Sequence, residues 1–493
     1  MKKHMQVLLY GSISVIALLL FYLTSAVYTP ILDSDPLWHL RLGEKMIEQK
    51  EFIHTAIFSF DETLPYVAHE TAFQLLLAGL HMLGGWNAVF IFWGGLIGLM
   101  LYGMIVLMDI SKKELNITRS IPSFYLLHVF IVGYLFIGTF SFKPMAISTV
   151  IILWFFIGMR AFNERPTWKL IISLSALSFL LSNFHSGVWL VPFILFILHI
   201  MDVLYRKKIT WRHVWLSIGI IVGGIMNPAG LKGIFYTSQV GEYKSKLISF
   251  QPISFSSDLF SYTLVVLFLV VAYFSVSKNL FRLLSVFALL YLGIAGYYSQ
   301  KFILIFLPYY LPAFGEFIVK KYTPQYRYSL PKKWEITVSV LGVLFLTVLI
   351  MKTGIKIDQK KYPVSEMNYI LKDHKGKTPP KVLADYLQSG YVIYRGGHVL
   401  MDARFDPYLV KRAKNVHNWN EFERGYNALT YGGDYLQEVI RYDKPEYIII
   451  PYVSKTLPES IEQVSMEKTI KEMGKPDFKG SSGMVWKIKK HND

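Results

Sequence analysis

The segment DSDPLWHLRLGE, residues 33–44, directly follows an apolar run at 6–28 that is long enough to cross a membrane. It places Asp33, Asp35 and His39 close together at the point where the chain would leave the bilayer. A connecting loop needs only to be polar. Two carboxylates and an imidazole at this position therefore indicate a functional site.

The composition of the 493-residue chain is that of a membrane protein. It is 53% hydrophobic and only 17% charged, whereas soluble domains contain about 25% charged residues. Apolar runs of about 20 residues recur along most of the chain, and each can cross about 30 Å of hydrocarbon. We therefore expect an α-helical polytopic membrane protein.

The apolar runs predict about eleven transmembrane helices. The predicted spans are 6–28, 86–108, 121–139, 144–160, 170–183, 187–205, 214–226, 259–276, 281–297, 302–319 and 335–351. The first run has two lysines before it, as a signal peptide would. Its apolar core is longer than that of a usual signal peptide and no small-residue cleavage site follows, which favours an uncleaved helix.

The positive charges predict the orientation of these helices. The net charge of +17 comes from Lys and Arg in short clusters between the apolar runs, and such clusters mark the cytoplasmic side. With the N-terminus in the cytoplasm, the inner connections hold Lys112, Lys113, Arg119, Arg160, Arg165, Lys169, Arg206, Lys207, Lys208, Arg212, Lys278, Arg282, Lys320, Lys321, Arg327, Lys332 and Lys333. The outer connections hold far fewer basic residues. This asymmetry predicts a multi-pass protein of the bacterial cytoplasmic membrane with its C-terminal part outside.

Two classes of site are excluded by the same composition. No basic groove with interleaved aromatic residues and no zinc-finger spacing is present, which argues against nucleic acid as a partner. The chain has no cysteine, so disulfides, thiolate metal sites and cysteine nucleophiles are excluded.

The composition divides the chain into a transmembrane domain, 1–354, and a small α/β domain, 355–493, which we expect on the extracytoplasmic side. In the second domain KVLADY, HVLMDAR, EYIIIP and GMVWKIK read as strands, and 363–373 and 432–442 as helices. The first outer loop, about 29–85, is more than a linker. Pro36 can open an amphipathic helix there, and a second amphipathic pattern ends at Gly84-Gly85.

Every outer connection of this topology carries an unusual polar element. These are Asp33, Asp35, His39, His69 and Glu70 in the first loop, then Lys143, Asn183 with His185, Asn227 in NPAG, and Lys301. The inner connections carry mostly generic basic clusters. Polar groups at membrane depth are costly, so they are usually functional or paired. Their convergence on one face predicts a catalytic or binding site there.

The acids of the first loop also have a structural interpretation. Asp35 before Pro36 is a favoured helix start. His39, four residues later, would share a helix face with Asp35. The two could bind a metal or relay a proton, or they could form a plain hydrogen-bonded surface pair.

The later polar residues have alternatives of the same kind. Lys143 and Lys301 either extend to the membrane interface or bind a phosphate group. Asn183 and His185 flank a break between two short spans, which a capped re-entrant turn would also explain. The residues of the NPAG segment are mainly those typical of a turn.

Together these motifs resemble those of a large bacterial family of GT-C-like integral membrane proteins, distant relatives of the protein O-mannosyltransferase, or family 39, glycosyltransferases. The matching motifs are Trp38-His39-Leu40 with Gly43, His54-Thr55 with Phe58-Ser59, Tyr66-Val67-Ala68-His69-Glu70, Lys143-Pro144-Met145, Asn183-Phe184-His185 with Gly187, Asn227-Pro228-Ala229-Gly230, Tyr362-Pro363-Val364, Ser389-Gly390-Tyr391, and Asp402-Ala403-Arg404 with Asp406 and Tyr408. The match covers nearly the whole chain in order. Lys143 replaces an Arg of the family pattern, and Ser186 and Ala403 each replace a Gly. Lysine keeps the charge but loses the bidentate fork that suits phosphate.

The resemblance implies roles for the candidate residues. Asp33 would be the general base or a ligand of a divalent metal, Mg²⁺ or Mn²⁺, with Asp35 as its partner, and Glu70 would complete the catalytic acids. The predicted substrate-binding residues are His39, His69, Lys143, Asn183, His185, Lys301, Tyr391, Asp402 and Arg404. Lys143 and Lys301 would neutralise a leaving polyprenyl phosphate, and His185 would contact that phosphate or the sugar. Tyr391, Asp402 and Arg404 would present the acceptor.

The predicted function is therefore transfer of a sugar from a polyprenyl-phosphate-linked donor to an envelope glycan, lipid or protein. An alternative is a catalytically inactive GT-C-fold scaffold or lipid-binding protein in cell-envelope assembly. A transporter or flippase would need ionisable residues near the bilayer midplane and inverted repeats, and the sequence shows little of either.

Overall fold

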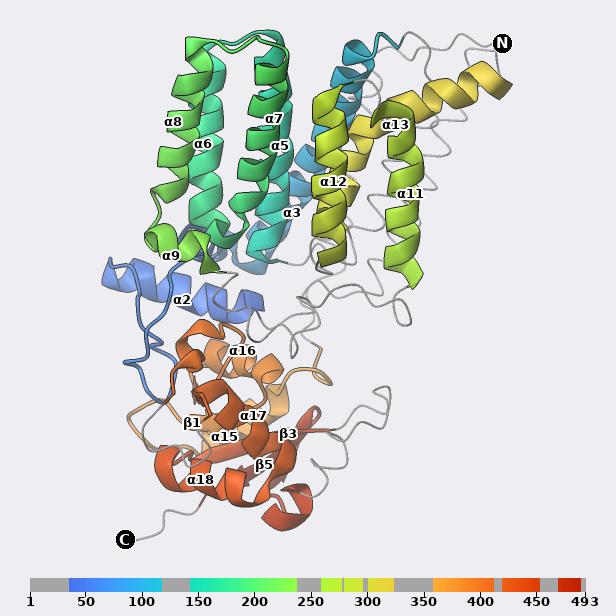
Figure 1. Cartoon of the computed structure of the whole chain (residues 1–493). Helices are drawn as coiled ribbons and strands as arrows, with labels where there is room; N and C mark the ends of the chain where they lie inside the picture. The colour runs from blue at the N-terminus through green and yellow to red at the C-terminus, as the bar shows by residue number, and fades with distance from the viewer. Residues whose placement is uncertain are drawn as a thin grey trace. The chain divides into compact units, whose positions relative to one another are not determined.

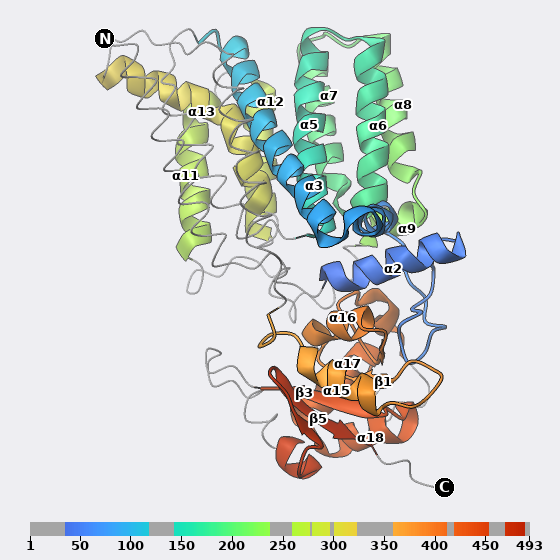
Figure 2. The same cartoon turned by 180° about the vertical axis from the view of Figure 1, so that it is seen from behind.

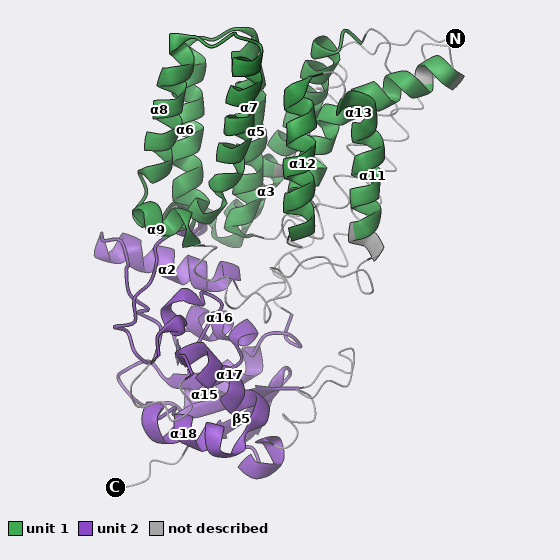
Figure 3. Ribbon diagram, in the orientation of Figure 1, with its two compact units in different colours: residues 1–28, 69–73, 83–354 green, residues 29–68, 74–82, 355–493 purple. Residues whose placement is uncertain are grey.

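The computed structural model describes residues 35–117, 142–236, 259–276, 279–295, 300–322, 358–411, 419–452 and 469–488. The chain divides into two compact units (Figure 3). Unit 1 comprises residues 1–28, 69–73 and 83–354, and unit 2 comprises residues 29–68, 74–82 and 355–493. The described part of unit 1 is helical, and unit 2 combines helices with a β-sheet.

The helices of unit 1 can be followed by their labels in Figure 1. They are α5 (Pro144–Glu164), α6 (Trp168–His185), α7 (Leu190–Tyr205), α8 (Trp211–Ile225), α9 (Gly230–Ile234), α11 (Leu259–Val276), α12 (Leu280–Ala295) and α13 (Gln300–Tyr322), with a 3₁₀ turn, η1 (Ser186–Val188). The long helix α3 (Thr71–Glu114) also belongs to unit 1, except for its residues 74–82, which belong to unit 2. It is kinked at Gly84 and Gly85, where the predicted amphipathic pattern ends, and Gly85 has a φ of +61°.

The predicted spans that fall on described residues lie on helices, and all except 86–108, which lies inside the longer helix α3, match the helix bounds to within a few residues. They lie in α3, α5, α6, α7, α8, α11, α12 and α13. The predictions at 6–28, 121–139 and 335–351 lie outside the described residues. Among the described helices, Thr71–Leu96, Pro144–Glu164, Trp168–Val188 and Lys301–Ile318 are long and apolar enough to cross a membrane. Four further described helices are apolar but shorter.

Small residues bring α6 and α8 close together, and the two helices lie side by side in both views (Figure 1, Figure 2). A Cβ added at Gly223 would lie 2.8 Å from the carbonyl oxygen of Ser175. The hydroxyl groups of Ser178 and Ser182 donate to the carbonyls of Ile220 and Gly223, at 2.7 and 2.9 Å. Close backbone approach with serine hydrogen bonds is how helices associate where lipid provides no hydrophobic driving force.

Unit 2 contains a five-stranded mixed sheet with the strand order β2-β1-β3-β5-β4. Strand β1 (Lys381–Leu383) is parallel to β2 (His398–Val399) and β3 (Tyr447–Pro451), and β5 (Gly483–Lys487) is antiparallel to β3 and β4 (Phe478–Lys479). The helices are α15 (Val364–Asp373), α16 (Tyr386–Tyr394), α17 (Glu421–Tyr431) and α18 (Gly433–Asp443). The segments predicted as strands contain β1, β2, β3 and β5, and the predicted helices correspond to α15 and α18.

Part of the first predicted loop belongs to unit 2. Helix α2 (Asp35–Gln49) packs against α16. The N–H of Phe60 donates to the Val399 carbonyl and the N–H of Val399 donates to the Phe58 carbonyl, both at 2.9 Å, so this segment runs beside β2. The N–H of Val67 donates to the Asp406 carboxylate at 2.7 Å. These bonds join segments that are more than 300 residues apart, and no local sequence pattern indicates them.

We expect Gly43→Ala to destabilise unit 2 by about 1–3 kcal/mol, the usual effect of overpacking. A Cβ at residue 43 would collide with the carbonyl oxygen of Gln74 and lie 2.9 Å from Ala78 Cβ. Gly79→Ala is the matched control, because a Cβ there meets no atom within 4 Å and alanine favours the helix. Thermal unfolding of the purified full chain compares the two variants. Equal melting temperatures would contradict the close approach of Gly43 to Gln74.

Candidate functional site

Four residues predicted at three separate outer connections come together within unit 1. We call His69, Glu70, His185 and Lys301 the His–Glu cluster. One oxygen of the Glu70 carboxylate lies 3.6 Å from His69 Nε2, and the other lies 3.7 Å from His185 Nε2. The two imidazole rings are 6.5 Å apart, and the charges of His69 and Lys301 both act on His185. His69, Glu70 and Lys301 are buried.

The ends of helices position these side chains. Glu70 immediately precedes α3, His185 is the last residue of α6, and Lys301 lies in the first turn of α13. Ser186, where the chain departs from the family pattern, donates both its N–H and its hydroxyl to the His69 carbonyl, at 3.0 and 3.3 Å. The ring of Tyr236 stacks on His69 with the centroids 3.6 Å apart. Backbone and ring contacts thus hold the His69 end of the cluster.

The His–Glu cluster combines two chemical abilities. Each carboxylate oxygen of Glu70 faces one imidazole, and a carboxylate in this position orients a histidine ring. The ammonium group of a lysine is a compact positive charge that suits a phosphate oxygen. The cluster can therefore bind an anion and form directed hydrogen bonds at the same place.

Lys143 and Asn183 lie at helix ends of unit 1 in different surroundings. Lys143 is half-buried and immediately precedes Pro144, the first residue of α5. The amide of Asn183 donates to the carbonyl of Phe179, at 2.9 Å, and to that of Met226, at 2.8 Å. These bonds join the ends of α6 and α8, so the observed role of Asn183 is structural, and substrate binding by either residue stays a prediction.

Asn227 organises the NPAG turn, as the sequence predicts. Its side-chain oxygen accepts from the N–H of Ala229 at 3.0 Å, and its amide donates to the carbonyls of Gly224 and Gly230 at 3.1 and 3.3 Å. Gly230 has a φ of +54°, a conformation that favours glycine. Turn chemistry therefore accounts for this motif.

The residues of the first loop are only partly described. Asp33 lies outside the described residues. Asp35 begins α2, and its carboxylate accepts from the indole N–H of Trp38 at 3.4 Å. His39 is buried, with its ring 3.6 Å from that of Trp38 and its Nδ1 3.4 Å from the amide nitrogen of Gln74. Within the described ranges, no group of three or more His, Asp or Glu is arranged to hold a metal ion, and the predicted metal role of the Asp33–Asp35 pair stays a prediction.

Asp402 and Arg404 form a buried ion pair in unit 2. The Arg404 guanidinium donates to both carboxylate oxygens of Asp402 at 2.6–3.0 Å, and the Tyr408 hydroxyl donates to the same carboxylate at 2.8 Å. Burial works against the charged form of Arg404, but the charge of Asp402 raises the pKa of this guanidinium well above its ordinary value. Burial raises the pKa of the Tyr408 hydroxyl well above its ordinary value, so this hydroxyl keeps the proton that it donates.

Tyr391 is also part of the core of unit 2. It is 2% exposed, its ring lies 6.0 Å from that of Tyr362, and its hydroxyl accepts from Arg395 at 3.1 Å. Tyr391, Asp402 and Arg404 are thus all buried. Their observed contacts are structural, and presentation of an acceptor by them stays a prediction.

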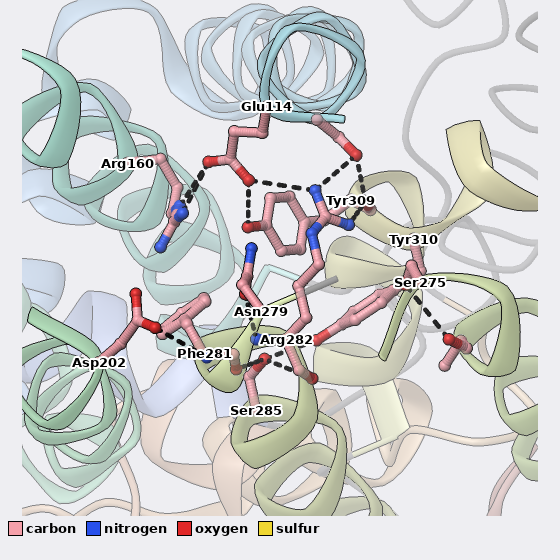
Figure 4. Close-up of polar contacts among 12 residues, drawn as sticks. Glu114, Arg160, Asp202, Ser275, Asn279, Phe281, Arg282, Ser285, Tyr309 and Tyr310 are labelled. Atoms are coloured by element: carbon pink, nitrogen blue, oxygen red, sulfur yellow. Dashed lines mark hydrogen bonds and ion pairs between the residues drawn. The ribbon is translucent and has the colours of Figure 1, made fainter. Parts of the chain in front are cut away.

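Sequence analysis missed a second polar group of unit 1, which we call the Glu114 cluster: Glu114, Arg160, Arg282 and Tyr309 (Figure 4). One oxygen of Glu114 accepts from Arg160 Nε and Nη2, at 2.8 and 2.7 Å. The other accepts from Arg282 Nη2 at 3.1 Å and from the Tyr309 hydroxyl at 2.6 Å. Arg160 and Arg282 are 1% and 0% exposed. One carboxylate therefore joins α3, α5, α12 and α13.

Further bonds attach Arg282 to the backbone of α13. Its Nη1 donates to the Tyr309 carbonyl at 2.9 Å, and its guanidinium lies 3.8 Å from the Tyr309 ring centre. The hydroxyl of Ser111 donates to the same carbonyl at 2.6 Å. The sequence interpretation of Arg160 and Arg282 as generic orienting charges was therefore incomplete. Arg160 and Arg282 fall within the ends of the predicted spans 144–160 and 281–297, and this was the signal that could have identified the cluster.

Comparison with known proteins shows which solved structures have a similar fold. No family model and no curated protein matches the sequence. The structure is similar to the crystal structure of ArnT from Cupriavidus metallidurans in the apo state, with a TM-score of 0.51 and 9% identity over 98% of each chain. It is equally similar to ArnT from the same organism bound to undecaprenyl phosphate, with a TM-score of 0.51 and 10% identity over 97% of each chain.

At this level of identity the likeness establishes a shared fold. It supports the GT-C fold that the motif resemblance implied, whereas the narrower relationship to the protein O-mannosyltransferases stays a prediction. Together with the apolar helices, it shows that this chain is an integral membrane protein with an ArnT-like GT-C fold.

Proposed function

We propose that the protein is a membrane glycosyltransferase that uses a polyprenyl-phosphate-linked sugar as donor and an envelope glycan, lipid or protein as acceptor. The observation that carries the proposal is the His–Glu cluster, in which a carboxylate lies between two imidazoles and the charge of a buried lysine acts on one of them, with the residues coming from three separate parts of the chain. The ArnT-like fold supports it, since one of the similar ArnT structures is bound to undecaprenyl phosphate.

In the proposed reaction the acceptor hydroxyl oxygen attacks the anomeric carbon of the sugar, and the bond from that carbon to the phosphate oxygen breaks. Lys301, with Lys143, neutralises the charge that develops on the leaving polyprenyl phosphate. Asp33 keeps its predicted role as the base that takes the acceptor proton or as a metal ligand, with Asp35 as its partner. A divalent metal bound there would polarise the phosphate group.

The topology belongs to the same proposal. With the N-terminus in the cytoplasm, the beginnings of α3, α5 and α13 and the end of α6 face the outside. The His–Glu cluster then lies at the outer membrane face, where a lipid-linked donor and an envelope acceptor can meet. Residues 355–493 would lie outside the membrane as well.

We expect Lys301→Ala to weaken binding of undecaprenyl phosphate by about 10- to 100-fold, since hydrogen bonds to charged groups contribute about 1.5–3 kcal/mol. Binding is measured on the purified full chain in detergent by native mass spectrometry, with undecaprenol as the ligand that lacks phosphate. Lys320→Ala is the matched control on the same helix, because Lys320 is 61% exposed and pairs only with Glu316 in the described salt bridges. Its affinity should equal that of the wild type.

Two results would count against this function. If the wild type binds undecaprenol as tightly as undecaprenyl phosphate, the protein does not recognise the phosphate. If it binds the phosphate but releases no sugar from a radiolabelled polyprenyl-phosphate-linked donor with any envelope acceptor, the inactive lipid-binding alternative replaces the transferase.

A further inference from the structure

His185 is the member of the His–Glu cluster whose two ring nitrogens have different surroundings. Its Nε2 lies 3.7 Å from the nearer oxygen of Glu70. Its Nδ1 is buried and has no hydrogen-bond partner among the described residues. The second oxygen of Glu70 lies 3.6 Å from His69 Nε2. The carboxylate therefore lies beside Nε2 of His185, whereas Nδ1 has no partner among the described residues.

The carboxylate decides which nitrogen carries the proton. A neutral imidazole, the common form at pH 7, has one N–H donor and one acceptor nitrogen. A negative charge beside Nε2 favours the tautomer with the proton on Nε2, since that proton then points at the carboxylate. In this tautomer Nδ1 carries a lone pair and is an acceptor. The geometry thus gives His185 an acceptor directed away from Glu70.

An acceptor nitrogen selects its ligand by chemistry. Ionised phosphate oxygens are acceptors only, so they cannot pair with a nitrogen lone pair. A sugar or alcohol hydroxyl is a donor and can pair with it. Lys301, which has only donors, is the group of the cluster that suits phosphate. The two residues therefore divide the ligand between them.

We propose that His185, oriented by Glu70, recognises a hydroxyl group through Nδ1 and makes no contact with the phosphate. The proposal rests on the proposed transferase function and deepens it, because it makes His185 a specificity residue for a hydroxylated ligand. That hydroxyl belongs either to the donor sugar or to the acceptor alcohol, and the two sources are distinguishable by experiment.

The test compares two lipids on the purified full chain: undecaprenyl phosphate and undecaprenyl phosphate carrying a hexose. If the hydroxyl is on the donor sugar, the wild type binds the glycosylated lipid more tightly than undecaprenyl phosphate. His185→Leu then weakens binding of the glycosylated lipid by at most about tenfold. Its affinity for undecaprenyl phosphate stays unchanged. If the hydroxyl is on the acceptor, both lipid affinities stay unchanged and the KM for a model alcohol, methyl glucoside, rises instead.

Two further variants separate recognition from packing. His185→Asn places an amide oxygen near the position of Nδ1 and should restore much of the lost affinity. His185→Gln places its amide near the position of Nε2, so it should satisfy Glu70 without restoring the hydroxyl contact. Equal behaviour of the Asn and Gln variants would overturn the assignment of Nδ1.

Other outcomes are also decisive. If His185→Leu and His185→Asn weaken the binding of undecaprenyl phosphate as strongly as the binding of the glycosylated lipid, then His185 contacts the phosphate and the proposal is wrong. Failure of the transferase function looks different, since the wild type itself would then either bind neither lipid in preference to undecaprenol or release no sugar from the labelled donor.

Discussion

Replacing Glu114 by alanine is expected to lower the free energy of unfolding by about 3–5 kcal/mol, the effect of removing one partner from a buried ion pair. The substitution leaves Arg160 and Arg282 inside the helix bundle without the carboxylate that each of them contacts. It also removes the acceptor of the Tyr309 hydroxyl. Thermal unfolding of the purified full chain in detergent should show a large fall in Tm, or loss of monodisperse protein.

Two further variants test whether the effect of Glu114→Ala comes from the loss of its buried charge. Glu114→Gln keeps the shape and the acceptor oxygen but not the charge, so we expect an intermediate effect. Asp109→Asn is the matched control on the same helix, because Asp109 contacts Lys112 at 3.8 Å in a partly exposed pair, and such pairs contribute about 0–1 kcal/mol. If Glu114→Ala and Asp109→Asn have the same Tm, the Glu114 cluster does not stabilise the bundle.

Asp402→Ala should have an effect of similar size in unit 2, again about 3–5 kcal/mol. It leaves the Arg404 guanidinium, which is 2% exposed, without the carboxylate that accepts its hydrogen bonds. It also removes the acceptor for the backbone N–H of Arg404, at 2.9 Å. Tyr408→Phe removes one hydroxyl donor from the same carboxylate and should cost only about 1 kcal/mol.

A double-mutant cycle with Asp402→Ala and Arg404→Met measures the coupling of this pair. Removing both charges should be less harmful than removing Asp402 alone, because no unpaired charge is left buried. Circular dichroism and Tm report the fold, and lipid binding reports the site. An Asp402→Ala protein of wild-type stability that loses sugar transfer would instead support the acceptor-binding role predicted from the sequence.

The sequence by itself determined which apolar segments of the described chain are helices. The apolar run at 259–276 predicted α11 at its observed bounds, and Pro144 and Asn227 marked a helix start and a turn that the structure contains. These features are local. A segment in hydrocarbon must satisfy its own backbone hydrogen bonds, so a run of about 20 apolar residues leaves little choice but a helix. Proline and asparagine act on the backbone within a few residues.

The sequence also indicated which polar residues of the His–Glu cluster were unusual, but not how they pair. Only the folded chain places Glu70 between the rings of His69 and His185, and gives Ser186 its two bonds to the His69 carbonyl. His185 and Ser186 are more than 100 residues from His69 and Glu70 in the chain. Their meeting depends on how the helices pack, and a local pattern carries no information about it.

Tertiary structure alone decided the remaining pairings. Glu114 reads as one acid after two lysines, yet it accepts from arginines of two other helices. Residues 58–60 read as loop, yet they hydrogen-bond beside β2 through Val399. In both cases the partner lies far along the chain. A buried charge or an unpaired strand edge requires a partner, but the requirement does not say where in the sequence that partner lies.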